Sequence, residues 1–161
     1  MIKALAFIYK KKGLSDGDFK NYYEKNHAPL ATSLLTFEGY ERNFVNANIN
    51  PLFASLGSIS IFQYQSIESL NDIEEKMSSD AGDILREDEL KFMDVSKNYF
   101  VLTQSNQLTE QRFQKKIFYP CNDEHDLGSL NSYEGLNKIS DNIILESTEM
   151  FGIAEYGITQ K

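Results

Sequence analysis

The first 105 residues alternate between strand-like and helix-like patterns in an order that few folds share. Apolar runs typical of strands and amphipathic runs with helical spacing follow one another as strand, helix, strand, strand, helix, strand. This order predicts an α+β fold of the ferredoxin-like type, a βαββαβ antiparallel sheet with both helical layers on one face. The expected strands are residues 2–9, 40–48, 58–65 and 97–103, and the expected helical segments are 15–28, 30–37, 84–93 and one that starts at Ser66 or Ser69 and includes Met77.

The first helix is well marked at both ends. Ser15 and Asp18 have the spacing of a capping box, with Asp in place of the usual Glu. A stripe at helical spacing includes one of the two histidines of the chain: Phe19, Tyr22, Tyr23, His27 and Leu30. Pro29 disfavours the helical conformation at Ala28, so the helix is expected to stop or kink there, with a titratable ring at its end.

Two of the expected strands are apolar on both faces. In residues 2–9 and again in residues 97–103, neighbouring apolar side chains point in opposite directions along the strand. A sheet with one wet face should alternate apolar with polar residues. Because the helices cover one face only, the other face is expected to meet a second subunit, the C-terminal extension or a ligand cavity.

Residues 105–161 form a C-terminal extension to a domain spanning residues 1–104. Its patterns predict strands at 113–119, 143–145 and 151–158 and a short helix at 133–139, which fits either a partial βαββ unit or a covering hairpin.

Composition restricts the partners. The net charge of −8 argues against duplex nucleic acid or an anionic membrane as a partner. The expected strand at residues 2–9 shows no cleavable leader pattern, and no apolar run approaches the roughly 20 residues of a membrane span. Cys121 is the single cysteine, which fits a reducing compartment, so a soluble cytoplasmic protein is expected.

We expect neither a metal nor a cofactor. Cys121 and His125 lie four residues apart, but a metal site of this kind needs a second converging pair, so an acidic solvated loop is the simpler interpretation. The sequence contains no glycine-rich phosphate loop, nucleotide fingerprint or nucleophile elbow.

Three sequence features resemble the EthD family of the dimeric α/β-barrel superfamily. The first is Lys-Gly-Leu-Ser at residues 12–15 followed by Asn-His-Ala-Pro-Leu at 26–30, which contains the family's His-Ala-Pro-Leu unchanged. The second is Gly39-Tyr40, and the third is Ser-Asp-Ala-Gly at 79–82 followed by the acidic and aromatic run at 88–94. The resemblance covers roughly residues 1–104 and says nothing about the extension.

The resemblance implies a homodimer whose two sheets pack into a barrel through the sheet face, with a cavity between each subunit's own sheet and helices. Relatives include cofactor-free lyases, decarboxylases, cyclases and isomerases of aromatic polyketides or lactones, and members linked to ether or aromatic degradation. In several relatives a histidine that matches His27 is taken as the acid or base. The resemblance therefore restricts the fold more than the substrate.

Two residues are candidates for the acid–base chemistry, His27 and Asp94, and each of them also has a purely structural interpretation. The imidazole of His27 can move a proton at neutral pH, as enolisation, dehydration or decarboxylation requires, or it can be a core histidine bonded to a backbone carbonyl. Asp94 can orient His27 or act as a second acid–base group, or it can simply end a helix before the last strand.

Aromatic residues of the expected strands and first helix can form an apolar pocket for a small hydrophobic ligand, or can be core or dimer contacts: Tyr9, Tyr23, Phe62, Tyr64 and Tyr99. The first functional hypothesis is a cofactor-independent lyase or isomerase that acts on an aromatic or lactone-like carbonyl compound. The alternative is a non-catalytic small-molecule-binding or scaffold dimer in which His27 is structural. A further option is an extension that fills the sheet face and replaces the dimer.

Overall fold

The computed structural model describes residues 2–46, 53–107, 115–123, 136–145 and 150–158. The chain divides into two compact units, Ala4–Phe100 and a second unit made of Met1–Lys3 with Val101–Lys161. Within these described residues, seven strands hydrogen-bond in the order β2-β3-β1-β4-β6-β7-β5, and four α-helices accompany them in an α+β arrangement. Strands β1 (Ile2–Tyr9) and β4 (Tyr99–Gln107) contribute residues to both units.

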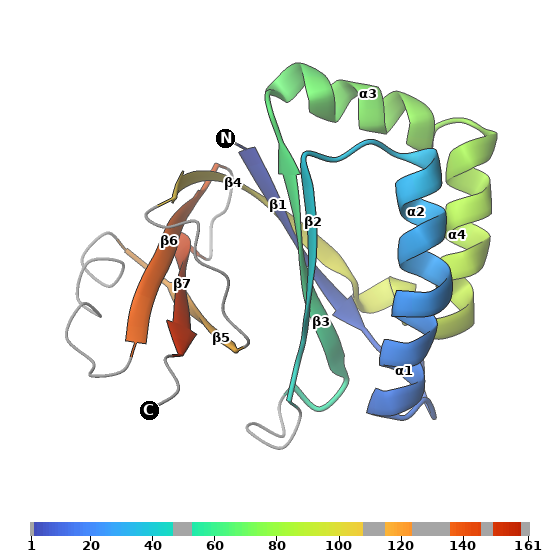
Figure 1. Cartoon of the computed structure of the whole chain (residues 1–161), viewed down its shortest axis with the longest axis horizontal. Coiled ribbons are helices and arrows are strands. Elements are labelled where there is room, and N and C mark those ends of the chain that lie inside the picture. The colour runs from blue at the N-terminus through green and yellow to red at the C-terminus, as the bar shows by residue number, and fades with distance from the viewer. Residues whose placement is uncertain (1, 47–52, 108–114, 124–135, 146–149, 159–161) are drawn as a thin grey trace. The chain divides into compact units, whose positions relative to one another are not determined.

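In the unit Ala4–Phe100, helices α1, α2 and α4 lie on one face of strands β1, β2 and β3 (Figure 1). Strands β2 and β3 pair antiparallel, with Tyr40 opposite Phe62. The elements of this unit, besides β1 and the start of β4, are α1 (Asp16–Tyr22), α2 (Ala28–Leu34), β2 (Gly39–Phe44), β3 (Leu56–Tyr64), α3 (Ile67–Met77) and α4 (Asp80–Phe92).

Serine side chains start three of the helices. Ser15 accepts a hydrogen bond from the backbone N–H of Asp18, as the capping-box spacing predicts. Of the two serines considered for the start of α3, Ser66 is the cap. Ser79 caps α4, which therefore begins at Asp80, four residues before the predicted segment.

The first helix was expected to stop or kink at Ala28, and the expectation that it stops there is wrong. After α1 the chain continues through a π-helical turn, Tyr23–His27, directly into α2. The N–H of Ala28 reaches back five residues to the carbonyl of Tyr23, and Pro29, which has no N–H to donate, follows directly after this turn at the start of α2. His27 therefore lies in the middle of a helical run and not at a helix end.

The core of this unit joins the sheet to the helices. Residues 3–8 of β1 are all buried, so both faces of this strand are covered, as its apolar pattern predicts. Ala6 and Ile8 of β1 belong to a buried cluster with residues of the helices and of the segment after α4: Phe19, Tyr23, Ala28, Phe92 and Met93. Strand β4 differs from β1, because Tyr99, Phe100 and Leu102 stay 41–62% exposed.

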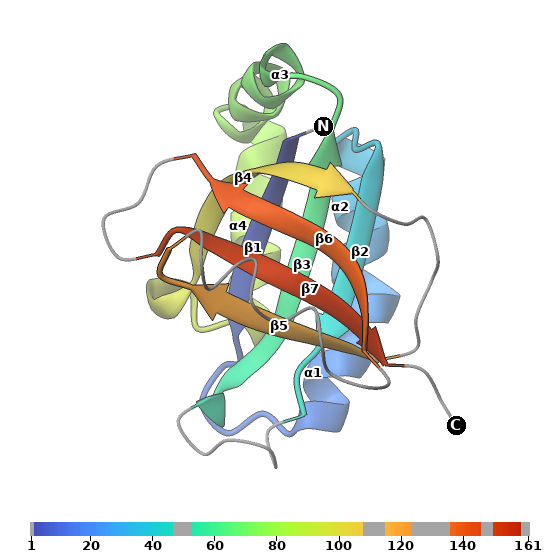
Figure 2. The same ribbon diagram turned by 90° about the vertical axis from the view of Figure 1, so that its left-hand side faces the viewer.

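Beyond β4, the second unit contains three strands that lie side by side in Figure 2: β5 (Lys116–Cys121), β6 (Leu136–Ile144) and β7 (Gly152–Ile158). Strand β7 pairs antiparallel with both β5 and β6. The helix predicted at 133–139 is wrong, because residues 136–139 begin β6, while 133–135 lie outside the described residues. Pro120 lies inside β5, which the sheet accepts because β5 is an edge strand.

Candidate functional site

The π-helical turn places His27 on the buried side of the helical layer. A π turn adds one residue to a helical repeat and so rotates the side chains that follow it, and such turns are frequent at functional sites. The residue His27 is only 5% exposed, and its ring packs against Tyr23 and Phe92, with ring centroids 5.3 and 5.0 Å away.

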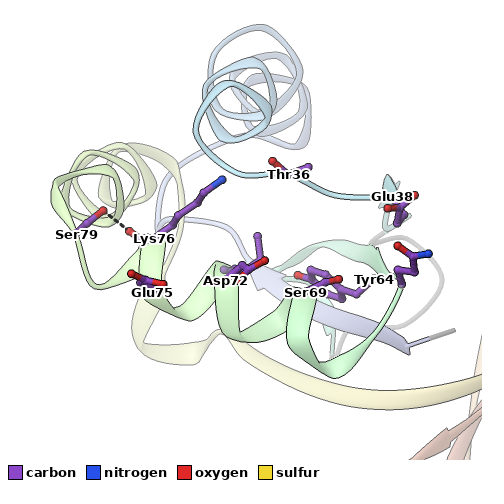
Figure 3. A pocket seen from close by; sticks show the side chains of 10 residues that line it. Thr36, Glu38, Tyr64, Ser69, Asp72, Glu75, Lys76 and Ser79 are labelled. Carbon is purple, nitrogen blue, oxygen red and sulfur yellow. Dashed lines mark hydrogen bonds between the residues drawn. The ribbon is translucent and has the colours of Figure 1, made fainter.

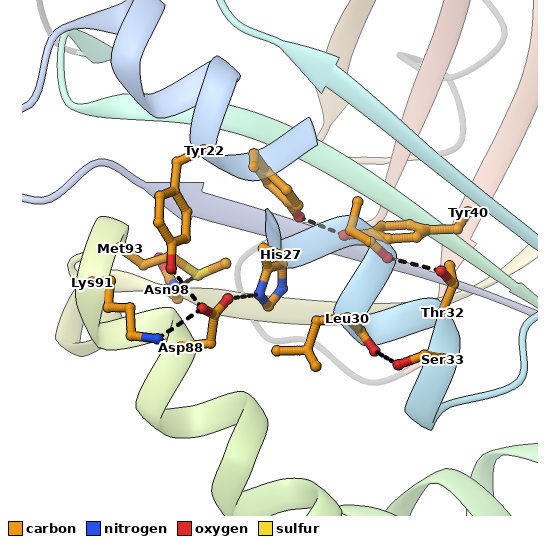
Figure 4. A network of polar contacts seen from close by, with 12 residues as sticks. Tyr22, His27, Leu30, Thr32, Ser33, Tyr40, Asp88, Lys91, Met93 and Asn98 are labelled. Atoms are coloured by element: carbon orange, nitrogen blue, oxygen red, sulfur yellow. Dashed lines mark hydrogen bonds and ion pairs between the residues drawn. The ribbon is translucent and has the colours of Figure 1, made fainter. Parts of the chain in front are cut away.

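Asp88 on α4 is the hydrogen-bond partner of His27. Its Oδ2 lies 3.0 Å from His27 Nδ1, while its Oδ1 accepts hydrogen bonds from the hydroxyl of Tyr22 at 2.6 Å and from Lys91 Nζ at 3.3 Å. Figure 4 shows these groups converging from the first helical run and from α4. Because an ionised carboxylate only accepts hydrogen bonds, Nδ1 of His27 carries the proton in this pair and Nε2 carries the lone pair.

The environment keeps Asp88 charged and His27 neutral. Burial lowers the pKa of His27 below its ordinary value and outweighs the opposing hydrogen bond and charge of Asp88. Burial acts against the charge of Asp88, but the hydrogen bonds from Tyr22, His27 and Lys91 outweigh it, so the pKa of this carboxyl is lowered. A neutral imidazole oriented by a carboxylate can accept a proton at neutral pH.

A line of hydroxyl groups adjoins this pair. The hydroxyl of Tyr40 donates to that of Tyr23 at 2.9 Å, and the hydroxyls of Tyr23, Ser60 and Ser58 follow one another at 2.9 Å spacing. Burial raises the pKa of Tyr23 above its ordinary value, so its phenol keeps its proton. These groups lie on the helix-facing side of the sheet, like His27.

The family assignment rests on the sequence of this same region. The family model described as EthD domain matches residues 11–96, which is more than half of the chain and includes His27 and Asp88. This chain belongs to the EthD family.

Two further comparisons concern individual proteins. A crystal structure of an ethyl tert-butyl ether D (EthD) family protein from Bacillus halodurans is similar to this chain at 20% identity and a TM-score of 0.47, over 65% of this chain and 98% of that one. A search of curated proteins finds no match.

Asp94 does not orient the histidine of this EthD domain. Its carboxylate lies just after α4, pairs with Lys97 at 2.9 Å and accepts a hydrogen bond from Ser96. The carboxylate that contacts the His27 ring is that of Asp88. A pattern in the sequence could have revealed Asp88. It interrupts the buried stripe of α4, between Leu85 and Phe92, and a carboxylate on an apolar helix face requires a partner.

The predicted aromatic residues separate into three groups. Tyr23 contacts His27 directly. Phe62 stacks on Tyr40 at 4.6 Å and so joins the same helix-facing cluster. Tyr9 and Tyr99 lie near each other, with centroids 6.5 Å apart, but Tyr99 stacks on Phe7, which points away from the helices.

Tyr64, the fifth predicted residue, lines a cavity of about 540 Å³ bounded by α3 and the segment that leads into β2. A smaller hollow of about 190 Å³ lies between the start of α1 and Gly57. His27 lines neither of these two cavities.

Two further features of the described residues concern metal binding and membrane spans. No group of three or more His, Cys, Asp or Glu side chains within it is placed to hold a metal ion. None of the helices described here has the length and apolar character that crossing a bilayer requires. Cys121 is buried and its thiol donates to the carbonyl of Tyr119 at 3.4 Å, whereas His125 lies outside the described residues.

Proposed function

We propose that this EthD protein is a cofactor-independent lyase or isomerase that moves a proton on a small hydrophobic carbonyl compound, aromatic or lactone-like, with His27 as the acid–base group. The observation that supports it most directly is the 3.0 Å contact between His27 Nδ1 and Asp88. This contact fixes the ring and leaves the lone pair of Nε2 to accept a proton from carbon next to a carbonyl.

Asp88 acts in this proposal as a positioning residue. When His27 takes up a proton, the neighbouring carboxylate stabilises the imidazolium without accepting the proton itself. Tyr22 and Lys91 support this role, because their hydrogen bonds favour the charged form of Asp88. A second acid–base role for Asp94 remains a separate proposal, and its ion pair with Lys97 does not favour it.

The aromatic residues would hold the substrate through their faces. Tyr23 is the strongest candidate, because it touches His27 and its hydroxyl belongs to the Tyr40–Ser60 line. Phe62 belongs to the same cluster, whereas roles for Tyr9, Tyr64 and Tyr99 would require the substrate, or a second site, to extend beyond it.

The assembly that we propose is a homodimer in the cytoplasm, formed through the sheet face of a ferredoxin-like domain at residues 1–104. The element order and the strand order β2-β3-β1-β4 support the ferredoxin-like arrangement. Residues 105–161 would be an extension that supports or replaces the dimer contact. Sedimentation equilibrium of the full chain distinguishes the two, since a monomer favours replacement.

Hydrogen exchange into substrate tests the chemistry without knowledge of the full reaction. The full chain is incubated in D₂O with a panel of aromatic ketones and lactones, and loss of the C–H signal next to the carbonyl is followed by proton NMR. We expect faster exchange in at least one compound, and a loss of about 10²-fold or more in His27→Gln. Glu87→Gln, at an exposed position of α4 next to Asp88 in sequence, is the carboxylate control. Full exchange activity in His27→Gln on that compound would refute the acid–base role.

The second candidate function is a non-catalytic small-molecule-binding or scaffold dimer in which His27 is structural. The observation that favours it is the 5% exposure of His27 between two aromatic rings. In that case the protein does not accelerate C–H exchange in any compound of the panel. His27→Ala then lowers the free energy of unfolding by several kcal/mol, as removal of a packed core group does.

A further inference from the structure

A cavity in the unit Ala4–Phe100 has a lining that does not include His27. Its volume is about 540 Å³, within the range of small-molecule sites. Figure 3 shows its two walls, one formed by α3 and the start of α4, the other by the segment between α2 and β2 and by the end of β3. The lining side chains are Thr36, Glu38, Tyr64, Gln65, Ser69, Asp72, Ile73, Glu75, Lys76 and Ser79.

Helix α3 presents one side to this cavity, polar except for Ile73. Ser69, Asp72, Ile73 and Lys76 follow the three-and-four spacing that brings side chains to the same side of a helix. Glu38 lines the cavity from the opposite wall. Two walls that contribute from different parts of the chain enclose a ligand better than a single charged helix face does.

The charges of the lining favour a cation. Three carboxylates, those of Glu38, Asp72 and Glu75, face one ammonium group, that of Lys76. In the part of the chain that the structure describes, none of these four side chains belongs to an ion pair. The cavity thus has an excess negative charge that no protein group neutralises, in a chain whose net charge is already −8.

Tyr64 adds a second and independent observation. It is 95% buried, since its exposure is 5%, and it lines the cavity, but its hydroxyl has no hydrogen-bond partner among the described residues. The hydroxyl oxygen is not one of the fully enclosed unpaired atoms of the described residues, so it is accessible to a ligand. A ligand in the cavity would give this hydroxyl a partner, and the tyrosine ring together with Ile73 would supply an apolar surface for the ligand's body.

We propose that this cavity binds a small organic cation, a protonated amine on a short apolar body, at a site separate from His27. A bare metal ion fits less well, because no three acidic or histidine side chains in the described residues converge as metal ligands would. The carboxylates would bind the ammonium group, and Tyr64 would contact the apolar body.

Titration of the isotope-labelled full chain with three matched compounds tests this proposal by NMR. Benzylammonium, benzyl alcohol and benzoate share a ring and differ in charge. We expect benzylammonium to shift the amide signals of Gln65, Ser69 and Asp72 at lower concentration than the other two compounds do. Its affinity should fall with added NaCl, because partly exposed charges are screened by salt. Equal affinity for the three compounds would overturn the proposal.

A pair of variants on one helix separates local from diffuse charge effects. Asp72→Asn should weaken benzylammonium binding about threefold, the effect of one exposed ion pair. Glu74→Gln changes the net charge equally, but Glu74 does not line the cavity, so the affinity should not change. Equal weakening in both variants, or signal shifts centred on His27 and not on α3, would refute this site. Shifts at His27 would leave the proposed acid–base function intact.

Discussion

Each unit of this protein buries a pair of titratable side chains in contact, and the two pairs differ in chemistry. In the unit Ala4–Phe100, His27 pairs with Asp88, and their side chains are 7% and 6% exposed. In the other unit, Lys3 on β1 pairs with Glu155 on β7 at 3.4 Å, with side chains 4% and 1% exposed. An imidazole can lie in the interior without charge, whereas a lysine–glutamate ion pair places two charges there.

The two pairs also differ in how completely their polar atoms are satisfied. Asp88 receives three side-chain hydrogen bonds, and the result is a charged acceptor that orients a neutral ring. Glu155 interacts through Oε2 with Lys3 and Ser140, while its Oε1 has no partner in the described residues. Asn142 Oδ1 and Ser105 Oγ nearby in the same unit also lack one. The His27–Asp88 pair thus has the geometry of a functional site. The Lys3–Glu155 pair lowers the stability of the fold unless hydrogen bonds from neighbouring groups offset the burial of its charges.

Glu155→Ala should cause the largest loss of stability. The substitution leaves the ammonium group of Lys3 buried without its carboxylate, and breaking a buried pair in this way costs about 3–5 kcal/mol. Amide hydrogen exchange measures the loss locally, and we expect the amides of β6 and β7 to exchange faster than those of α4.

The control is the double variant Lys3→Met/Glu155→Leu, which removes both charges. Well-packed apolar residues in place of a buried ion pair are often neutral, or stabilise by about 1–4 kcal/mol. We therefore expect the double variant to be much more stable than Glu155→Ala. Equal destabilisation in both would mean that Lys3 and Glu155 act through packing and not through their charges.

Asp88→Ala should cost less, about 2–3 kcal/mol, because only hydrogen bonds to a charged group are lost. His27 remains neutral without its partner, so no buried charge is left behind. Urea unfolding followed by circular dichroism measures the loss. A loss as large as that of Glu155→Ala would show that the two pairs are energetically alike.

The His27 pair should also respond to pH. The folded pKa of His27 is lowered, so the unfolded chain binds more protons once the pH falls below the ordinary value of about 6.5. The stability from the neutral ring is thus fully present above that pH and is lost as the pH falls from there toward the folded pKa.

Urea midpoints between pH 7.5 and 5 measure this effect, in the background His125→Gln, so that His27 is the single histidine. Asp88 does not interfere, because its stabilising contribution is lost only near and below the ordinary value of an aspartate, about 3.9. His27→Gln should flatten the profile in this window. An unchanged slope in that variant would assign the pH dependence to other groups.

The sequence predicted the elements whose determinants are local. The apolar runs, the serine caps and the stripe that contains His27 are short-range patterns, and the structure has β1, β3 and the start of α1 where these patterns place them. The burial of both faces of β1 also followed from its composition, which leaves no polar face for water.

The features that the sequence missed depend on long-range contacts. The π-helical turn reflects packing of Tyr23 and His27 against Phe92, and Pro29 alone fits both a helix end and a helix start. Asp94 was proposed as a partner of His27, whereas the carboxylate in contact with the ring is Asp88, which the tertiary packing of α4 buries beside it. Strand β6 was predicted in part as a helix because its pairing with β7, not its own pattern, determines its conformation.

The smallest effect that we predict concerns the hydrogen bond from Tyr22 to Asp88, which sets the His27–Asp88 pair apart from the Lys3–Glu155 pair. Tyr22→Phe removes one donor from Asp88 Oδ1 and keeps the ring that packs on Phe92 at 5.0 Å. The loss should be about 1 kcal/mol, a single hydrogen bond. Tyr40→Phe is the matched control, because its hydroxyl donates to the neutral hydroxyl of Tyr23 and not to a carboxylate.

The two variants should differ at His27 more than in stability. Without the Tyr22 hydroxyl, the carboxylate of Asp88 accepts one hydrogen bond fewer and stabilises a protonated His27 ring more strongly. We therefore expect the pKa of His27 to rise toward its ordinary value. In Tyr40→Phe the pKa of His27 should stay where it is. Titration of the His27 ring signals by NMR, with His125→Gln in both variants, measures the difference. An equal response in the two variants would mean that Asp88 does not control the charge of His27, and the contrast between the two buried pairs would then rest on burial alone.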